Sequence, residues 1–167
     1  ATWDITGDVT VSEGDLSYIS AFGDINSSIA VPAGKIGSLT ATNIAGYIDV
    51  SGDLGGYGGN GLYGISASGD VNATVDTGGT LYLVKAGGSV QGHMSSAGDF
   101  RDLEAGLDID AAVDASGTLS SVSAGRDISG SDINAVQINA LTVGRDLSSA
   151  VTASGDPTDG NGGRIAA

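Results

Sequence analysis

The chain has 167 residues, of which 29 are Gly, two are Pro and none is Cys, and its formal net charge is −14. This length predicts a single domain, and the excess of acidic residues excludes the basic surface that nucleic acid or anionic lipid requires. No apolar run approaches the roughly 18 residues of a membrane-spanning helix. We therefore expect neither a nucleic-acid partner nor membrane insertion.

The composition favours strands and turns over helices. Only two of the 20 acidic residues are Glu, which favours helices, and the others are Asp, which favours turns. Hydrophobic residues make up 40% of the chain, enough for a core despite the high Gly content. We therefore predict an all-β protein, and the absence of Cys excludes a disulfide framework and a cysteine-ligated metal.

A repeat of about 19 residues organises most of the chain. Aliphatic residues recur at intervals of two within each repeat, the spacing that returns side chains to one face of a strand. Gly-rich segments such as SGD and GRD separate the two halves of each repeat. Each repeat is therefore predicted to be one coil with two strands and two tight corners.

The predicted elements follow one another along residues 1–156. Residues 1–15 form a partial coil, and residues 16–53 form two irregular coils, the first one position longer and the second one position shorter than the regular repeat. Residues 54–61 form an inserted Gly-rich loop, residues 62–156 form five regular coils, and residues 157–167 form a Gly-rich terminal tail. The first positions of the regular coils are Leu62, Leu81, Phe100, Leu119 and Ile138. The predicted fold is an all-β parallel β-solenoid, or β-helix, of about seven and a half coils with strands about 4.8 Å apart.

One coil departs from this pattern. Asp132 stands where the other coils carry an inward aliphatic residue, and Ile133 follows it. An unpaired carboxylate in an apolar core costs several kcal/mol, so we predict a bulge that turns Ile133 inward and Asp132 outward. The alternative is a buried Asp132 with a catalytic or metal-binding role.

Two corners of the regular coils carry the same motif. They read AGLDI from Ala105 and AGRDI from Ala124. With the uninterrupted period of the repeat, this motif resembles the repeats of filamentous-haemagglutinin-type adhesins and of other bacterial surface β-solenoid proteins. The resemblance implies a right-handed parallel β-helix on a secreted or cell-surface protein, with a structural or adhesive role in a stalk or filament.

Nearly every residue has a place in the strands or corners of the repeat. The sequence therefore shows no converging set of nucleophile, base and orienting group, as a catalytic site would need. The one His, His93, alternates with Met94 and is expected to face solvent. We therefore expect no enzymatic activity and no required cofactor.

Stacked Asp residues at the corners suggest a Ca²⁺ site, because hard cations favour clustered carboxylate oxygens. The candidate ligands are Asp108, Asp127 and Asp146 at one corner, Asp156 at the opposite corner and Asp159 in the terminal DPTDGNG segment. In the alternative interpretation each Asp accepts hydrogen bonds from corner amides, with Arg126 and Arg145 stacked beside Asp127 and Asp146. The segment GGYGGNGLY, with Asn60, matches a Ca²⁺-binding nonapeptide once, without the stacked copies that such sites share.

Three residues suggest a ligand surface. Tyr63 and Tyr82 occupy one outward column of the predicted stack, and Arg101 continues it. Aromatic faces next to a cation are typical of surfaces that bind sugars or cations, so the alternative function is a carbohydrate-binding or polysaccharide-active β-helix. The cluster of Arg101, Asp102 and Glu104 is the nearest approach to the acids and bases of such enzymes.

The ends of the stack suggest the partners. The terminal coil of a solenoid exposes unpaired backbone groups and an open core unless a polar cap covers it. The segment ATWDITGDV, with Trp3 and Ile5, contains no recognisable cap. We therefore expect either further coils of a longer chain or end-to-end stacking with copies of this one.

Overall fold

The computed structural model describes residues 3–58, 61–130 and 132–155. Over these residues the chain forms strands, turns and bends but no helix, so none of the elements described is a helix able to cross a membrane. The strands are β1 (Val9–Thr10), β2 (Leu16–Ser20), β3 (Ile25–Asn26), β4 (Ile29–Val31), β5 (Ile36–Ala41), β6 (Ile44–Val50), β7 (Gly56–Gly58), β8 (Gly61–Tyr63), β9 (Ile65–Ala67), β10 (Val71–Thr77), β11 (Leu81–Ala86), β12 (Val90–Ser96), β13 (Phe100–Ala105), β14 (Ile109–Ala124), β15 (Ile133–Ile138), β16 (Leu141–Val143) and β17 (Val151–Ala153).

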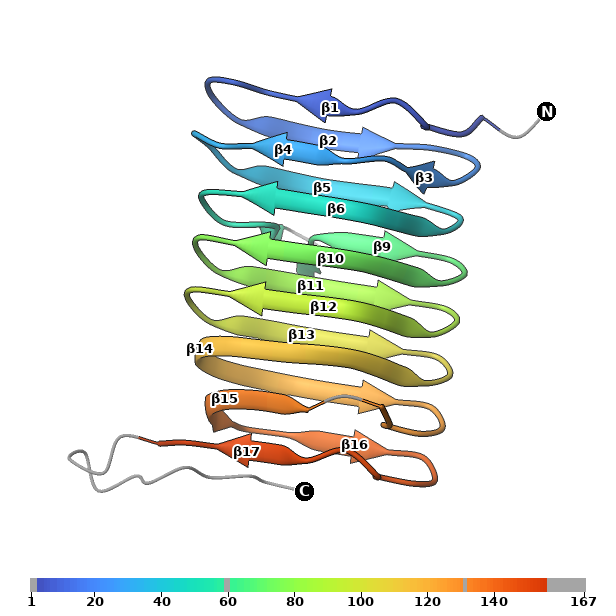
Figure 1. Ribbon diagram of the computed structural model, residues 1–167, viewed down its shortest axis with the longest axis vertical. Coiled ribbons are helices and arrows are strands. Elements are labelled where there is room, and N and C mark those ends of the chain that lie inside the picture. The colour runs from blue at the N-terminus through green and yellow to red at the C-terminus, as the bar shows by residue number, and fades with distance from the viewer. Residues whose placement is uncertain (1–2, 59–60, 131, 156–167) are drawn as a thin grey trace.

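The strands stack as a parallel β-solenoid of about seven coils (Figure 1). The first row contains β2, β5, β9, β11, β13, the second half of β14, and β16, and the second row contains β1, β3, β4, β6, β10, β12, the first half of β14, β15 and β17. Each strand pairs in parallel with the equivalent strand of the next coil, and β14 runs through a corner from one row to the other. The predicted fold class is confirmed.

The core lies between the two rows and consists of ladders of like residues. Val71, Val90 and Ile109 pair in succession, each one regular coil after the last, and all three are fully buried. Phe100 lies between Leu81 and Leu119 in the same way. Such burial stabilises the fold by roughly 1.5–3 kcal/mol per large aliphatic side chain. The apolar period that predicted the coils therefore also forms the core.

The two irregular coils have the predicted lengths. Leu16 pairs with Ile36, one position beyond the regular period, and Ile36 pairs with Leu54, one position short of it. Leu54 then pairs with Leu81, so Leu54 occupies the core position predicted for Leu62. Leu54 is fully buried, whereas Leu62 is partly exposed.

The insertion is accordingly an antiparallel β-hairpin rather than the loop expected at residues 54–61. Its strands β7 and β8 pair Gly56 with Tyr63 and Tyr57 with Leu62. The solenoid enters the hairpin at Gly55, whose N–H donates to Ile36, and leaves it at Gly64, whose carbonyl oxygen accepts the N–H of Leu39. Residues 56–63 are therefore added between two adjacent positions of an ordinary coil.

The prediction that Ile133 turns inward and Asp132 outward is confirmed, and the register of β14 with β15 shifts between Ala115 and Thr118. Val113 pairs with Ile133 rather than with Asp132, and Ile133 is fully buried while Asp132 is exposed. The next step, from Ile133 to Val151, is one position shorter than a regular coil, which restores the frame of the repeat. Exposure of Asp132 avoids the desolvation of a carboxylate in the core. The predicted tail, residues 157–167, lies outside the residues described.

Candidate ligand-binding surface and corner ladders

One corner of the solenoid carries a continuous ladder of side-chain hydrogen bonds, which we call the corner ladder. At each step a side-chain oxygen accepts the backbone N–H of the equivalent residue in the next coil. Its members are Asp4, Asp24, Asn43, Asp70, Ser89, Asp108, Asp127 and Asp146, with donor–acceptor distances of 2.9, 3.1, 2.8, 2.8, 3.4, 3.2 and 3.1 Å along the chain. The Asp column that the repeat predicts therefore bonds amides of neighbouring coils.

Two Arg residues reinforce this ladder. Arg126 donates from Nε to Oδ1 of Asp108 at 3.1 Å and pairs through Nη2 with Oδ2, and Arg145 donates from Nη2 to Oδ2 of Asp127 at 2.6 Å. Each guanidinium therefore reaches back to the Asp of the preceding coil, one step away from the neighbours expected, Asp127 and Asp146. The hydrogen bond from Arg126 lowers the pKa of Asp108 and raises that of Arg126.

These bonds occupy the oxygens of two proposed Ca²⁺ ligands. Both oxygens of Asp108 and both oxygens of Asp127 accept hydrogen bonds from backbone or Arg donors. Asp146 is the last member of the ladder, and Asp156, Asp159 and Asn60 lie outside the described residues. Within the described part of the chain, no group of three or more His, Asp or Glu side chains is placed to hold a metal ion. Ca²⁺ at this corner would have to compete with the Arg side chains.

The opposite corner has a shorter version of the same arrangement. The carboxylates of Asp15, Asp53 and Asp99 accept the N–H groups of Lys35, Thr80 and Thr118 at 2.9 Å each. Lys35 also donates from Nζ to Oδ2 of Asp53 at 2.8 Å. This hydrogen bond, followed by that from Thr80, lowers the pKa of Asp53, and the same Asp53 contact raises the pKa of Lys35.

The β7–β8 hairpin brings an aromatic pair to the outer face of the first row. The rings of Tyr57 and Tyr82 meet edge to face, with centroids 5.2 Å apart and planes at 88°. The predicted stack of Tyr63 on Tyr82 is wrong, because Gly55 holds the column position directly before Tyr82. Tyr63 lies instead across the hairpin, where its ring covers Gly56 and Gly58. Sequence reasoning missed Tyr57 because it belongs to the insertion.

A cavity of about 310 Å³ lies beside Tyr63, between the hairpin and the two preceding coils. Asp15, Lys35 and Ser17 supply its charged and polar groups, and Tyr63 supplies an aromatic wall. Sugars bind through stacking on aromatic rings and hydrogen bonds to such polar groups. The hairpin therefore forms one wall of a surface that has the chemistry of a small carbohydrate site.

Arg101 continues the column of Tyr82, as predicted, in the next coil. Its Nη2 pairs with Oδ2 of Asp99 at 3.0 Å, and its Nε is buried without a hydrogen-bond partner. Burial, followed by the negative charge of Glu104, raises the pKa of the neighbouring Asp102. Glu104 itself pairs with Lys85 at 2.6 Å. Arg101, Asp102 and Glu104 are thus three partly exposed side chains of β13, and Arg101 and Glu104 are each paired with an opposite charge.

His93, the one His, lies on the outer face of the second row with Nε2 3.9 Å from Oδ2 of Asp114. The side chains of both residues are substantially exposed. The expectation that His93 faces solvent while Met94 faces the core is confirmed.

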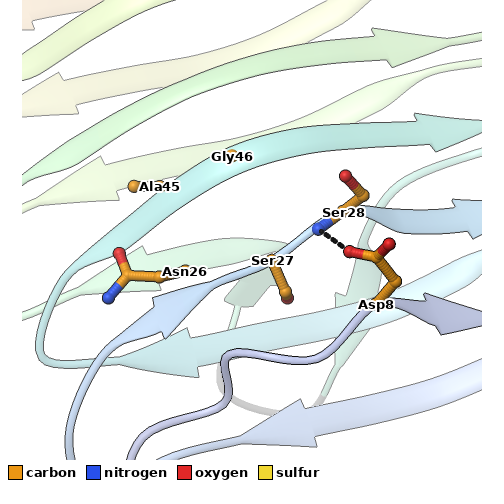
Figure 2. Close-up of a pocket in the computed structure, with 6 residues that line it drawn as sticks. All are labelled: Asp8, Asn26, Ser27, Ser28, Ala45 and Gly46. Atoms are coloured by element: carbon orange, nitrogen blue, oxygen red, sulfur yellow. Dashed lines mark hydrogen bonds between the residues drawn. The ribbon is translucent and has the colours of Figure 1, made fainter.

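A second hollow, of about 390 Å³, lies on the second row near the first coils (Figure 2). Asp8 accepts the N–H of Ser28 at 3.2 Å at its rim, and Asn26 adds an amide. The hydroxyl of Ser27 is buried without a hydrogen-bond partner. Sequence reasoning did not single out these residues, although Ser27 stands in an inward position that Ala73 and Ala111 fill in later coils.

Comparison of the chain with protein-family models, with curated proteins and with solved structures finds no match in any of the three.

Proposed function

We propose that the chain is a structural or adhesive β-solenoid, a segment or subunit of an extracellular or cell-surface stalk or filament. The observation that carries this proposal is the corner ladder, which ties every coil to the next from Asp4 to Asp146. Backbone pairing and a continuous core join the same coils. A stack held by three parallel sets of contacts resists bending, which suits a stiff spacer.

The corner motif supports the same proposal. AGLDI and AGRDI resemble filamentous-haemagglutinin-type repeats, and the residues that follow Ala105 and Ala124 in them supply Asp108, Asp127 and Arg126 to the ladder. On this proposal the motif holds the coils of the rod together, and the protein is located outside the cell. We expect no catalytic activity on polysaccharides.

Immunolabelling of intact and permeabilised source cells tests the location, and small-angle scattering of the purified chain tests the shape. We expect labelling of intact cells and the scattering of a stiff rod. Labelling that requires permeabilisation, or cleavage of a polysaccharide in a substrate panel, would contradict the proposal.

A carbohydrate-binding role is the second candidate, and the Tyr57–Tyr82 pair beside the Tyr63 cavity favours it. A glycan array probed with the purified chain tests this role. Binding should be lost in Tyr57→Ala and Tyr82→Ala and kept in Tyr47→Ala, which changes a Tyr on the second row. Equal binding by all three variants would reject the site.

A further inference from the structure

Both ends of the solenoid expose core positions. Inside the stack each coil covers the core residues of its neighbours, whereas among the residues that the structure describes the end coils are covered on one side only. The incompletely buried positions are Ile5, Val9, Val11, Leu16, Ile19 and Ala21 at one end and Leu141, Val143, Leu147, Val151 and Ala153 at the other. Leu147 is 46% exposed, whereas Ile128, one coil earlier, is 1% exposed.

In the second row these exposed positions match one another column by column. An unbroken series of pairs leads from Ile5 through Ile25, Ile44, Val71, Val90, Ile109 and Ile128 to Leu147. A second series leads from Val9 through Ile29 and Ile48 to Val151. Ile5 of one molecule would therefore meet Leu147 of another in the geometry that joins Ile128 to Leu147. The two ends are therefore complementary in chemistry and in position along the second row, whereas in the first row the same placement leaves one strand position between β16 of one copy and β2 of the other.

The corner ladder has a direction that makes its ends complementary as well. At every step the later coil donates an N–H and the earlier coil accepts it with a side chain. The first coil therefore offers the N–H of Asp4, and the last coil offers the carboxylate of Asp146. Among the described residues, no ladder member lies beyond either of them. A second molecule placed after Asp146 would continue the ladder without a break.

A backbone series at the same corner places Trp3 against Arg145. Each N–H in this series donates to the carbonyl oxygen one coil earlier, from Gly23 bonded to Trp3 at 3.2 Å to Arg145 bonded to Arg126 at 2.8 Å. One more step would set Trp3 of a second molecule next to Arg145. Trp3 is 72% exposed, and a Trp face attracts a guanidinium group. This contact would bury an aromatic ring that the single molecule leaves in solvent.

We propose that two copies of this chain stack head to tail, with Asp4, Ile5 and Trp3 of one copy against Asp146, Leu147 and Arg145 of the other. This inference rests on the proposed structural function and names the partner as a second copy of the chain. The net charge of −14 opposes side-by-side association, so the ends are the favoured contact. Repetition of the contact produces a filament one solenoid wide.

Sedimentation velocity of the full 167-residue chain over a concentration series tests the proposal, together with the emission of Trp3, the one Trp of the sequence. We expect the average mass to rise with concentration and Trp3 emission to shift to shorter wavelength in parallel. Leu147→Glu should abolish both changes. Leu107→Glu is the matched control, because Leu107 is 40% exposed but lies at a corner in the middle of the stack.

Trp3→Ser provides a second test if Leu147→Glu lowers stability, since Trp3 is largely exposed and its loss should weaken association without lowering the melting temperature. A chain that stays monomeric at all concentrations would overturn the proposal. Association that survives Leu147→Glu and Trp3→Ser but is lost in Tyr47→Ala would also overturn it, because Tyr47 is exposed on the side of the stack in β6. A monomeric stiff rod would reject head-to-tail stacking and leave the structural function standing.

Discussion

At the level of single residues, the corner ladder explains why one position accepts Asp, Asn and Ser. Each of these side chains carries an oxygen close enough to the backbone to accept an N–H from the next coil. Asp70 accepts the N–H of Ser89 at 2.8 Å, whereas the shorter Ser89 side chain accepts that of Asp108 at 3.4 Å. The position therefore selects for an oxygen at the right distance rather than for a charge.

Substitution of Asp70 tests this rule. Asp70→Ala removes the acceptor of the Ser89 N–H and should lower the free energy of unfolding by about 1 kcal/mol. Asp70→Asn keeps an oxygen in the same place, as Asn43 does one coil earlier, and should cost less. Urea denaturation measures both, and an equal loss in the two variants would show that the charge matters instead.

Stability should fall in acid because of the paired carboxylates. Asp53 and Asp108 have pKa values below the usual 3.8 in the folded chain, owing first to Lys35 and Arg126 respectively. The unfolded chain therefore takes up protons at a higher pH than the folded chain does. The free energy of unfolding should be steady from neutral pH down to about pH 5 and should decrease below about pH 4. Urea denaturation at a series of pH values measures this.

Two variants separate the contributions to this profile. Asp53→Asn keeps the acceptor for Thr80 but loses the titrating group, so the decrease in acid should be shallower. Asp102 behaves oppositely because burial raises its pKa, so its charged form opposes folding near neutral pH and protonation relieves this. Asp102→Asn should therefore raise stability slightly at pH 7 and not at pH 3. Unchanged acid profiles in both variants would refute this assignment.

At the level of elements, the Gly column at the corner sets how closely the coils approach. A Cβ at Gly87, Gly106, Gly125 or Gly144 would lie 2.1–2.2 Å from a carbonyl oxygen of the preceding coil. Backbone atoms cannot move away without breaking the hydrogen bonds of the corner, such as that from Gly106 to Ala86. Only Gly therefore fits at these four positions, because adjacent coils approach too closely there for a Cβ atom.

Gly106→Ala should lower the free energy of unfolding by about 2 kcal/mol, because its Cβ would overlap the carbonyl oxygen of Gly87. Gly7→Ala is the control, since a Cβ there meets no atom within 4 Å. Thermal denaturation followed by circular dichroism compares the two. Similar melting temperatures would show that the corner can widen.

The hairpin should be dispensable for the fold. Removal of residues 56–63 joins Gly55 to Gly64 and leaves Leu54 and Ile65 three positions apart, the spacing of Leu81 and Val84. The shortened chain should fold into the same stack with an unchanged β signal and a similar melting temperature. Circular dichroism measures both, and an unfolded product would mean that the hairpin supports the first row.

The repeat predicts most elements because each column of like residues fixes one position of the coil. It also predicts that Ile133 is buried, because burial of the Asp132 carboxylate would cost more free energy than a bulge. It cannot place the insertion, since Leu54 and Leu62 are both aliphatic and only Leu62 lies three positions before Ile65. Because the hairpin closes after Gly55, Leu54 takes the core position. Tyr57 rather than Tyr63 is then the neighbour of Tyr82.

The repeat also does not predict which side chains pair with one another at the corners. The spacing puts Arg126 next to Asp127 in the chain, yet the long Arg side chain reaches Asp108 one coil back. Sequence columns give the coil of each residue but not the direction in which a flexible side chain extends. Tyr82 and Arg101 occupy one column as the repeat predicts, but the aromatic neighbour of Tyr82 is Tyr57, which the repeat does not predict.

For the whole molecule, we predict that Ca²⁺ is not needed to hold the stack together. Arg and backbone donors already satisfy Asp108 and Asp127, so removal of divalent cations should leave the fold unchanged. Titration with a chelator should change the melting temperature by less than about 2 °C. Loss of the β signal in chelator, restored by added Ca²⁺, would make calcium an integral part of the structure.

The interchangeable positions of the coils bear on how such a protein changes over generations. Apart from the contact of Tyr82 with Tyr57, a coil such as residues 81–99 pairs with its neighbours through column positions that the regular coils share. In-frame duplication or loss of the gene segment for one coil therefore preserves the pairing on both sides. Duplication of half a coil would instead exchange the two rows and mismatch every column. Selection can thus adjust the reach of the rod in steps of one coil while the sequence of each coil stays as it is.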